Sequence, residues 1–185
     1  FPGYRRLNAR LERRVLSTAD RVTTLSTTLR DMLVSLGELP TDRVTIIENG
    51  YDEDDVRVLP PPRTAAFTIT YTGEFSRLRK PDAFVAAIDL LLARGDIPRE
   101  ALRVAFAGTQ THRFVPDRPP FEQLGYLSHD RLDALRQDTD LLLLIQGDSP
   151  TAPAKLYEYL GSNRPTLSIA NPGNVGSELV TRTRG

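Results

Sequence analysis

Residues 141–160 of this 185-residue chain read LLLLIQGDSPTAPAKLYEYL, and this stretch decides the fold class. Its first five residues form a continuous apolar run, as expected for a strand that is covered on both faces. A loop of small residues follows, and Pro153 precedes an amphipathic segment that ends at Gly161. Proline suits a first helical turn, because its missing amide hydrogen would have no intrahelical partner there. The stretch therefore predicts a buried strand, a tight loop and a helix over 153–160.

The same alternation of strand and helix continues on both sides of this stretch. The patterns predict strands over 67–71, 102–107, 121–124 and 166–169, and helices that start near Pro81, Ser128 and Val175. Strands that alternate with helices at this spacing indicate a parallel sheet. We therefore expect an α/β fold, with a Rossmann-like parallel sheet and helices on both faces.

The first 50 residues predict a separate helix–strand–helix–strand unit. The helices are expected over 4–18 and 26–36, and the strands over 21–25 and 44–47. Ser26 or Thr27 suits the cap of the second helix, and Gly37 suits a left-handed residue that ends it. Residues 51–65 are acidic and then proline-rich, which is typical of a linker. The expected organisation is thus 1–50, a linker over 51–65, and a sheet domain over 66–185.

Composition excludes several classes of protein. Lysine plus arginine equal aspartate plus glutamate, at 24 each, which argues against a nucleic-acid binder. The absence of cysteine rules out disulfides and thiolate metal sites and fits a reducing compartment such as the cytoplasm. No apolar run approaches the roughly 20 residues that span a bilayer. Because the chain lacks a starting methionine and stops soon after its last predicted helix, we expect it to be part of a longer protein.

The loop after Ile145 is the strongest candidate for a ligand site. Ligands of open parallel sheets bind at the carboxyl ends of the strands. Free amides at a helix start bind anions, and Lys155 in the first turn makes sense if an anion shares the site. Glu158 lies on the same helix face and can accept two ribose hydroxyls. The spacing alone fits equally well an ordinary loop followed by a helix with solvent-exposed Lys155 and Glu158.

Six motifs in order resemble the group 1 (GT4-like) family of GT-B glycosyltransferases. Pro153-Ala154-Lys155-Leu156-Tyr157-Glu158-Tyr159 with Arg164-Pro165 is similar to the donor-site motif of that family. The others are Ala19-Asp20-Arg21-Val22 with Leu25-Ser26, Ile46-Ile47-Glu48-Asn49-Gly50, Tyr71-Thr72-Gly73, Phe106-Ala107-Gly108 with Leu124-Gly125-Tyr126, and Asp140-Leu141-Leu142. The resemblance implies that 1–50 closes an acceptor-side domain and that 66–185 is an incomplete donor domain.

The resemblance also implies a function and a set of site residues. The family transfers a sugar, usually a hexose and with retention, from a nucleotide-diphosphate sugar, and needs no metal or other cofactor. Glu158 would hold the ribose, and Gly125-Tyr126 would face the base. The remaining donor-binding positions would be Gly73, Arg77, Lys80, Asp148, Ser149, Thr151, Ala152 and Lys155. Arg77 and Lys80 would be the basic pair that contacts the pyrophosphate, and Arg79 is the alternative to them. The acceptor (a glycan, a lipid-linked molecule or a small molecule) and the catalytic residues stay unassigned, and we expect this part alone to be inactive.

Two departures from the family pattern keep other functions open. Pro150 stands where the family has a second glutamate on the sugar side, and Glu74 replaces an arginine that often follows the first glycine. Asp148 or Ser149 could reach the sugar instead. The alternatives are a nucleotide-sugar epimerase of the same fold and a non-catalytic nucleotide-binding or assembly module.

Two further charged segments have more than one interpretation. The basic helix over 4–18 carries five arginines and the stripe Leu7, Leu11 and Val15. It suits either packing on protein, which we favour, or peripheral contact with an anionic membrane. The acidic run over 52–55 resembles a metal-binding motif, but a solvated loop beside a proline-rich linker is the expected interpretation.

Overall fold

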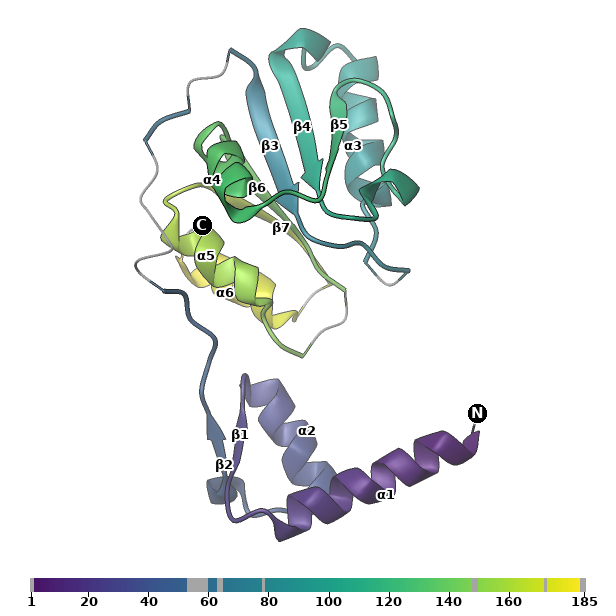
Figure 1. Cartoon of the computed structure of the whole chain (residues 1–185), viewed down its shortest axis with the longest axis vertical. Helices are drawn as coiled ribbons and strands as arrows, with labels where there is room; N and C mark the ends of the chain where they lie inside the picture. The colour runs from purple at the N-terminus through teal and green to yellow at the C-terminus, as the bar shows by residue number, and fades with distance from the viewer. Residues whose placement is uncertain are drawn as a thin grey trace.

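The computed structural model describes residues 2–52, 60–62, 65–77, 79–147, 150–171 and 173–183. Two parallel sheets divide the elements, one of two strands near the N-terminus and one of five strands after residue 66. Figure 1 shows the small sheet with helices α1 and α2 at one end of the molecule and the large sheet at the other. We call residues 2–52 the N-terminal unit and residues 65–183 the sheet unit.

The N-terminal unit is a parallel β–α–β arrangement preceded by a long helix. Its elements are α1 (Pro2–Thr18), β1 (Val22–Thr24), α2 (Thr27–Gly37), a 3-10 turn (Thr41–Arg43) and β2 (Val44–Ile46). Strands β1 and β2 pair in parallel from Val22 opposite Val44. Leu16, Leu39 and Val44 form its buried core, and Leu33, Val34 and Leu36 of α2 pack against them. The helix–strand–helix–strand order predicted from the sequence is therefore correct.

The end of α2 differs from the prediction. Gly37 is the last residue of the helix, and Glu38 adopts the left-handed conformation (φ 52°, ψ 41°) while its amide donates to the carbonyl of Val34. A Cβ at Gly37 would lie 3.0 Å from the Cβ of Leu16 on α1. The assignment of Gly37 as the left-handed stop was wrong, because this glycine serves the close approach of α1 and α2. Ser26 is the cap, since its hydroxyl accepts a hydrogen bond from the amide of Leu29 (3.1 Å).

The sheet unit has five parallel strands in the order β5-β4-β3-β6-β7. The strands are β3 (Phe67–Thr72), β4 (Leu102–Ala107), β5 (Phe121–Gly125), β6 (Leu141–Ile145) and β7 (Thr166–Ile169). The helices are α3 (Asp82–Ala93), α4 (His129–Gln137), α5 (Ala154–Gly161) and α6 (Val175–Thr183), with 3-10 turns over Arg99–Ala101 and Thr111–Arg113. The chain thus runs outward from the central β3 to one edge and then returns to build the other half of the sheet.

Helices cover both faces of this sheet, as Figure 1 shows. On one face, Phe84 and Ile88 of α3 pack on Val104 and Phe106 of β4 within one apolar cluster. On the other face, Leu156 and Tyr159 of α5 and Val180 of α6 pack on Leu142 and Leu144 of β6, and Leu135 of α4 packs on Ala105 and Ala107. Successive residues of a strand point to opposite faces, so the fully apolar β6 serves both clusters. The predicted Rossmann-like α/β fold is confirmed.

The central strand β3 carries threonines on the face that meets α5. Thr68, Thr70 and Thr72 are all buried, at 0%, 0% and 7% exposure. The hydroxyl of Thr70 lies 2.7 Å from that of Thr139, and the hydroxyl of Thr72 lies 2.7 Å from that of Tyr159. These buried hydroxyls are paired, as the cost of burying a polar group requires.

One helix start differs slightly from the sequence prediction. Pro153 occupies the cap position of α5 in an extended conformation (φ −69°, ψ 144°), so the helix begins one residue later, at Ala154. Ser128 stands at the cap of α4 as predicted, but its side chain makes no capping hydrogen bond. Helix α6 starts at Val175 as predicted, and the side chain of Asn174 caps it by accepting from the amide of Gly176 (2.9 Å).

The first helix presents its apolar stripe to solvent. Leu7, Leu11 and Val15 are 54%, 51% and 66% exposed. In Figure 1 the N-terminal end of α1 projects away from the rest of the molecule. Within the described residues, no helix is both long and apolar enough to cross a bilayer.

Side chains connect the two units. The hydroxyl of Ser26, which caps α2, donates to the carbonyl of Pro150 in the loop between β6 and α5 (2.5 Å). Beside this bond, a small cavity of about 130 Å³ is lined by both units, among others by Thr27, Glu48, Tyr157 and Glu178. Ser26 is 4% exposed, so the contact is shielded from water. The start of α2 therefore supports the loop that leads into α5.

Candidate functional site

The candidate site lies where β3 and β6 meet. Strands β4 and β5 extend the sheet on one side of β3, and β6 and β7 extend it on the other. Adjacent loops therefore leave the carboxyl ends of β3 and β6 in opposite directions, which opens the crevice where doubly wound sheets bind ligands. The two strands pair only at Ile69–Leu141 and Thr70–Leu142. Beyond these pairs the ladder ends, and the carbonyl of Thr72 is available to another donor.

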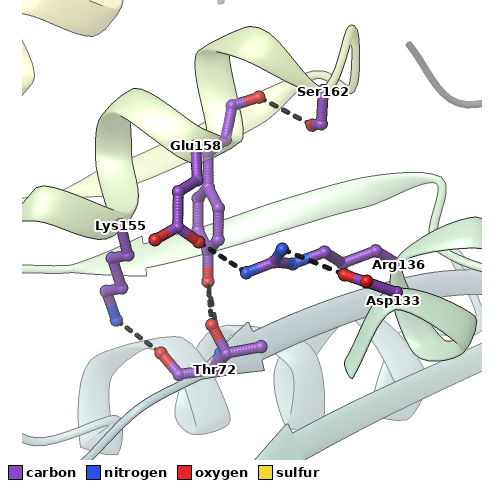
Figure 2. Close-up of polar contacts among 7 residues, drawn as sticks. Thr72, Asp133, Arg136, Lys155, Glu158 and Ser162 are labelled. Atoms are coloured by element: carbon purple, nitrogen blue, oxygen red, sulfur yellow. Dashed lines mark hydrogen bonds and ion pairs between the residues drawn. The ribbon is translucent and has the colours of Figure 1, made fainter. Parts of the chain in front are cut away.

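Lys155 of α5 occupies this opening between the two strands. Its Nζ donates a hydrogen bond to the carbonyl oxygen of Thr72 (2.6 Å) and lies 4.1 Å from the centre of the Tyr71 ring. Figure 2 shows the side chain reaching from α5 to the end of β3. Both partners are electrically neutral, since a carbonyl and an aromatic face attract a cation without cancelling its charge. The ammonium group is therefore placed at the carboxyl end of β3, and no contact with another described residue neutralises its charge.

The surroundings of Lys155 weaken its hold on a proton. Burial, and to a smaller extent the positive charge of Arg79, lower the pKa of Lys155 to about 7, while Glu158 acts in the opposite direction. Arg79 is held near the same place, because its guanidinium donates to the carbonyl of Glu74 (2.6 and 3.2 Å). Two basic groups thus converge at the end of β3. Such convergence is typical of a site that an anion shares.

Tyr159 fixes the position of α5 over β3. One turn after Lys155 on the same helix face, its hydroxyl lies 2.7 Å from the hydroxyl of Thr72 and accepts from the amide of Thr72 (3.3 Å). The ring is fully buried, and burial raises the pKa of the Tyr159 phenol. Lys155 and Tyr159 therefore clamp the same residue of β3, so the lysine is held on a rigid element.

Glu158 faces α4 instead of β3. Its Oε2 accepts from the guanidinium of Arg136 (2.6 Å), and Arg136 also lies 3.4 Å from a carboxylate oxygen of Asp133 one turn earlier. Figure 2 shows Glu158 between Lys155 on one side and Arg136 on the other. The Glu158 side chain is 39% exposed. The carboxylate is thus oriented by a partner and reachable from solvent, which are both needed to accept a ligand hydroxyl.

Glycines let the backbone close around the ends of β3 and β4. Gly73 has φ +125°, a conformation that favours glycine, and its amide donates to the carbonyl of Ala107 (2.8 Å). A Cβ at Gly73 would lie 3.1 Å from Nζ of Lys155, and one at Gly108 would lie 2.1 Å from the carbonyl oxygen of Gly73. A side chain at Gly73 would therefore crowd the Lys155 ammonium, and one at Gly108 would clash with the backbone of the loop after β3.

Glu74, which departs from the family pattern, forms hydrogen bonds with the loop after β4. Its Oε1 accepts from the amide and the hydroxyl of Thr109 (2.7 and 2.6 Å). These hydrogen bonds lower the pKa of the Glu74 carboxyl. Glu74 therefore ties the loop after β3 to the loop after β4.

The other residues predicted for the site differ in how exposed they are. Arg77 and Lys80 are exposed beside the turn in which Ser76 and Arg79 exchange backbone hydrogen bonds (3.0 and 3.1 Å). Gly125 has φ +64°, and Tyr126 next to it is 76% exposed. Ala152 is buried in the cluster under α5, and Thr151 is half-buried. Asp148, Ser149 and residues 53–55 of the acidic run lie outside the described residues.

Several residues of the site were missed by sequence reasoning. Arg136, Tyr71 and Thr72 contact Lys155 or Glu158 directly, and Arg79 was only a rival candidate. Arg136 is separated from Glu158 by 22 residues and lies on another helix, so no local spacing links them. One sequence feature could have identified Thr72 as a site residue: it directly precedes Gly73, the glycine that opens the first predicted loop.

A comparison with family models matches residues 2–55 to the model described as Glycosyltransferase Family 4. This chain resembles family 4 glycosyltransferases of the GT-B fold. The resemblance inferred from the sequence motifs is thereby confirmed. The matched residues cover the N-terminal unit, whereas Lys155 and Glu158 lie outside them. A comparison with curated protein sequences finds no match.

Solved structures of other proteins show the same fold across both units. TarM matches with a TM-score of 0.65 at 10% identity, over 94% of this chain and 38% of TarM. Sucrose-phosphate synthase from Thermosynechococcus elongatus gives 0.64 at 13%, over 97% and 52%. HepE from Anabaena, solved in complex with UDP-glucose, gives 0.58 at 15%, over 96% and 57%. The chain spans 38–57% of the length of these proteins, and identities this low show the fold alone.

Proposed function

We propose that this chain is the nucleotide-binding part of a glycosyltransferase that transfers a sugar from a nucleotide-diphosphate sugar to an acceptor. One observation carries the proposal: the Lys155 ammonium bonds the carbonyl of Thr72 at the point where the sheet order reverses, with Glu158 one turn away. Fixed cations there stabilise a leaving diphosphate, which is the main electrostatic task of such a transfer. We further propose that the reaction is a hexosyl transfer with retention.

The arrangement supports separate roles for the site residues. Lys155 and Arg79 supply the positive charge that two phosphates require, and Glu158 supplies an oriented acceptor for ribose hydroxyls. The missing side chain at Gly73 keeps the space beside the Lys155 ammonium open for a diphosphate. UDP is a natural first probe, because HepE was solved with UDP-glucose.

Calorimetry with UDP, GDP, ADP and CDP tests the proposal. We expect the chain to bind at least one of them while it transfers little sugar by itself, because acceptor groups come from the part of the fold that it does not span. Glu158→Ala should weaken that binding about tenfold, since a hydrogen bond to a charged group is worth about 1.5–3 kcal/mol. Glu178→Ala, an exposed glutamate on α6, is the matched control. No binding to any nucleotide by the folded chain would refute the function.

One observation favours a second candidate, a non-catalytic nucleotide-binding module. Pro150 replaces the family's sugar-side glutamate, and its carbonyl is already bonded to Ser26. Such a module would bind the nucleotide diphosphate but gain no affinity from the sugar. Equal affinity for UDP and UDP-sugars, with no transfer by a full-length protein, would support the module over the enzyme.

A further inference from the structure

Arg136 holds one end of the Glu158 carboxylate. The bond is short (2.6 Å from Nη2 to Oε2), and Arg136 comes from the last turn of α4, where a cation is favoured by the helix dipole. Among the described residues, Oε1 of Glu158 makes no hydrogen bond or ion pair. The planar guanidinium therefore fixes the orientation of the carboxylate and leaves its second oxygen for a ligand.

Stability alone does not explain this arrangement. The Arg136 side chain is 17% exposed, whereas Glu158 and Asp133 are 39% and 56% exposed, so the cation is the least hydrated member of the group. Ion pairs with such exposed partners add little to stability. Within the described residues, the Nε of Arg136 is buried without a hydrogen-bond partner, which is a cost of keeping the arginine here. Buried donors without a partner are uncommon in native structures.

We propose that Arg136 is a positioning residue that presents Glu158 to the ribose hydroxyls of a nucleoside diphosphate and so makes the site selective for ribose over 2′-deoxyribose. The inference rests on the proposed function, because it needs a nucleotide at this site. Arg136 acts through Glu158, whose free oxygen accepts the hydroxyl. Without the guanidinium, the glutamate side chain keeps its charge but loses its fixed direction.

The test compares each nucleoside diphosphate with its 2′-deoxy form by calorimetry. We expect the wild-type chain to prefer the ribose form of its best nucleotide about tenfold, the amount that one hydrogen bond to a charged group provides. Arg136→Ala should bring this ratio close to one while the deoxy form binds nearly as before. Arg136→Lys, which keeps the charge without the planar fork, should give an intermediate ratio and guards against misfolding of the alanine variant.

Two further variants separate positioning from a general effect of charge. Arg131→Ala, an exposed arginine on the same helix, should leave the ratio unchanged. Adding Arg136→Ala to Glu158→Ala should cause no further loss, because the arginine acts through the glutamate. An unchanged ribose preference in Arg136→Ala would overturn the inference and leave the function intact. If the wild-type chain binds none of the nucleotides, both the function and the inference fail.

Discussion

Replacing Lys155 with methionine should make the fold more stable and the site less able to bind an anion. Methionine keeps the length and flexibility of the side chain but removes the charge. The lysine is held over the Tyr71 ring and against the carbonyl of Thr72, where burial lowers its pKa to about 7 from a normal 10.5. A buried ammonium is therefore tolerated in this fold at a cost, and that cost disappears in the variant.

The size of the effect follows from the pKa. At about 1.4 kcal/mol per unit, a shift from 10.5 to about 7 corresponds to roughly 5 kcal/mol of destabilisation at pH 7 and below, where both the folded and unfolded chains carry the charge. Removal of the hydrogen bond and of the attraction to the Tyr71 ring offsets about 2–4 kcal/mol of this in the variant. We expect Lys155→Met to be about 1–3 kcal/mol more stable than the wild type at pH 7.

The pH dependence is the sharper signature. Between pH 7 and 10.5 the unfolded chain keeps the proton that the folded chain releases, so wild-type stability rises with pH in this window. The stability difference between Lys155→Met and the wild type should therefore change in favour of the wild type by about 1.4 kcal/mol per pH unit well above pH 7, which amounts to roughly 2 kcal/mol from pH 7 to pH 9. The slope reports the proton alone, because the difference in packing between methionine and lysine is the same at both pH values.

Urea denaturation followed by circular dichroism at pH 6.5, 7, 8 and 9 measures this difference. Lys80→Met is the matched control, because Lys80 is exposed and is the only other lysine in the sequence; its difference from the wild type should not change with pH. If the stability difference between the wild type and Lys155→Met were the same from pH 7 to pH 9, the lowered pKa of Lys155 would be refuted. If the variant were stabilised yet bound nucleotide like the wild type, Lys155 would have no part in binding.

Two other predictions concern packing around the site. Gly108→Ala should destabilise the fold by at least about 2 kcal/mol in urea denaturation, because its methyl would lie 2.1 Å from the carbonyl oxygen of Gly73. Gly50→Ala, with open space around its Cβ, should cost little, and equal effects of the two substitutions would contradict this account. Tyr159→Phe should cost about 1–3 kcal/mol, because it leaves the buried amide and hydroxyl of Thr72 without the phenol. An unchanged melting temperature in Tyr159→Phe would show that the clamp on β3 is unimportant.

Much of the fold could be predicted from local patterns. The strands Leu102–Ala107 and Leu141–Ile145 have the bounds that the apolar runs indicated, because both faces of an inner strand are covered and every position is then constrained. The edge strand Thr166–Ile169 also has its predicted bounds. Gly37 was misread for a physical reason. Glycine suits a left-handed helix end and also a close helix contact, and only the neighbouring Leu16 shows which need it meets.

The site was less predictable than the fold. The position of Lys155 and Glu158 on α5 followed from helical spacing, but their partners did not. Arg136 reaches Glu158 from another helix, and Lys155 reaches a backbone carbonyl of β3 that is free only because the β3–β6 ladder stops early. Both contacts depend on how α4 and α5 pack on the sheet. The relative positions of two elements produce no periodic pattern in the sequence, so they could not be predicted from it.

The threonines on the inner face of β3 have a consequence for the chain as it leaves the ribosome. Strands β3 to β5 are synthesised before β6 and α5, so the part of this face that α5 later covers is exposed in the interval, whereas α3 already packs on the opposite face. Thr68, Thr70 and Thr72 present hydroxyls to water during that interval. Leucines at these positions would expose an apolar surface to other nascent chains. The row of threonines on which Lys155 and Tyr159 later pack is thus less apolar in the half-made sheet than a row of leucines would be.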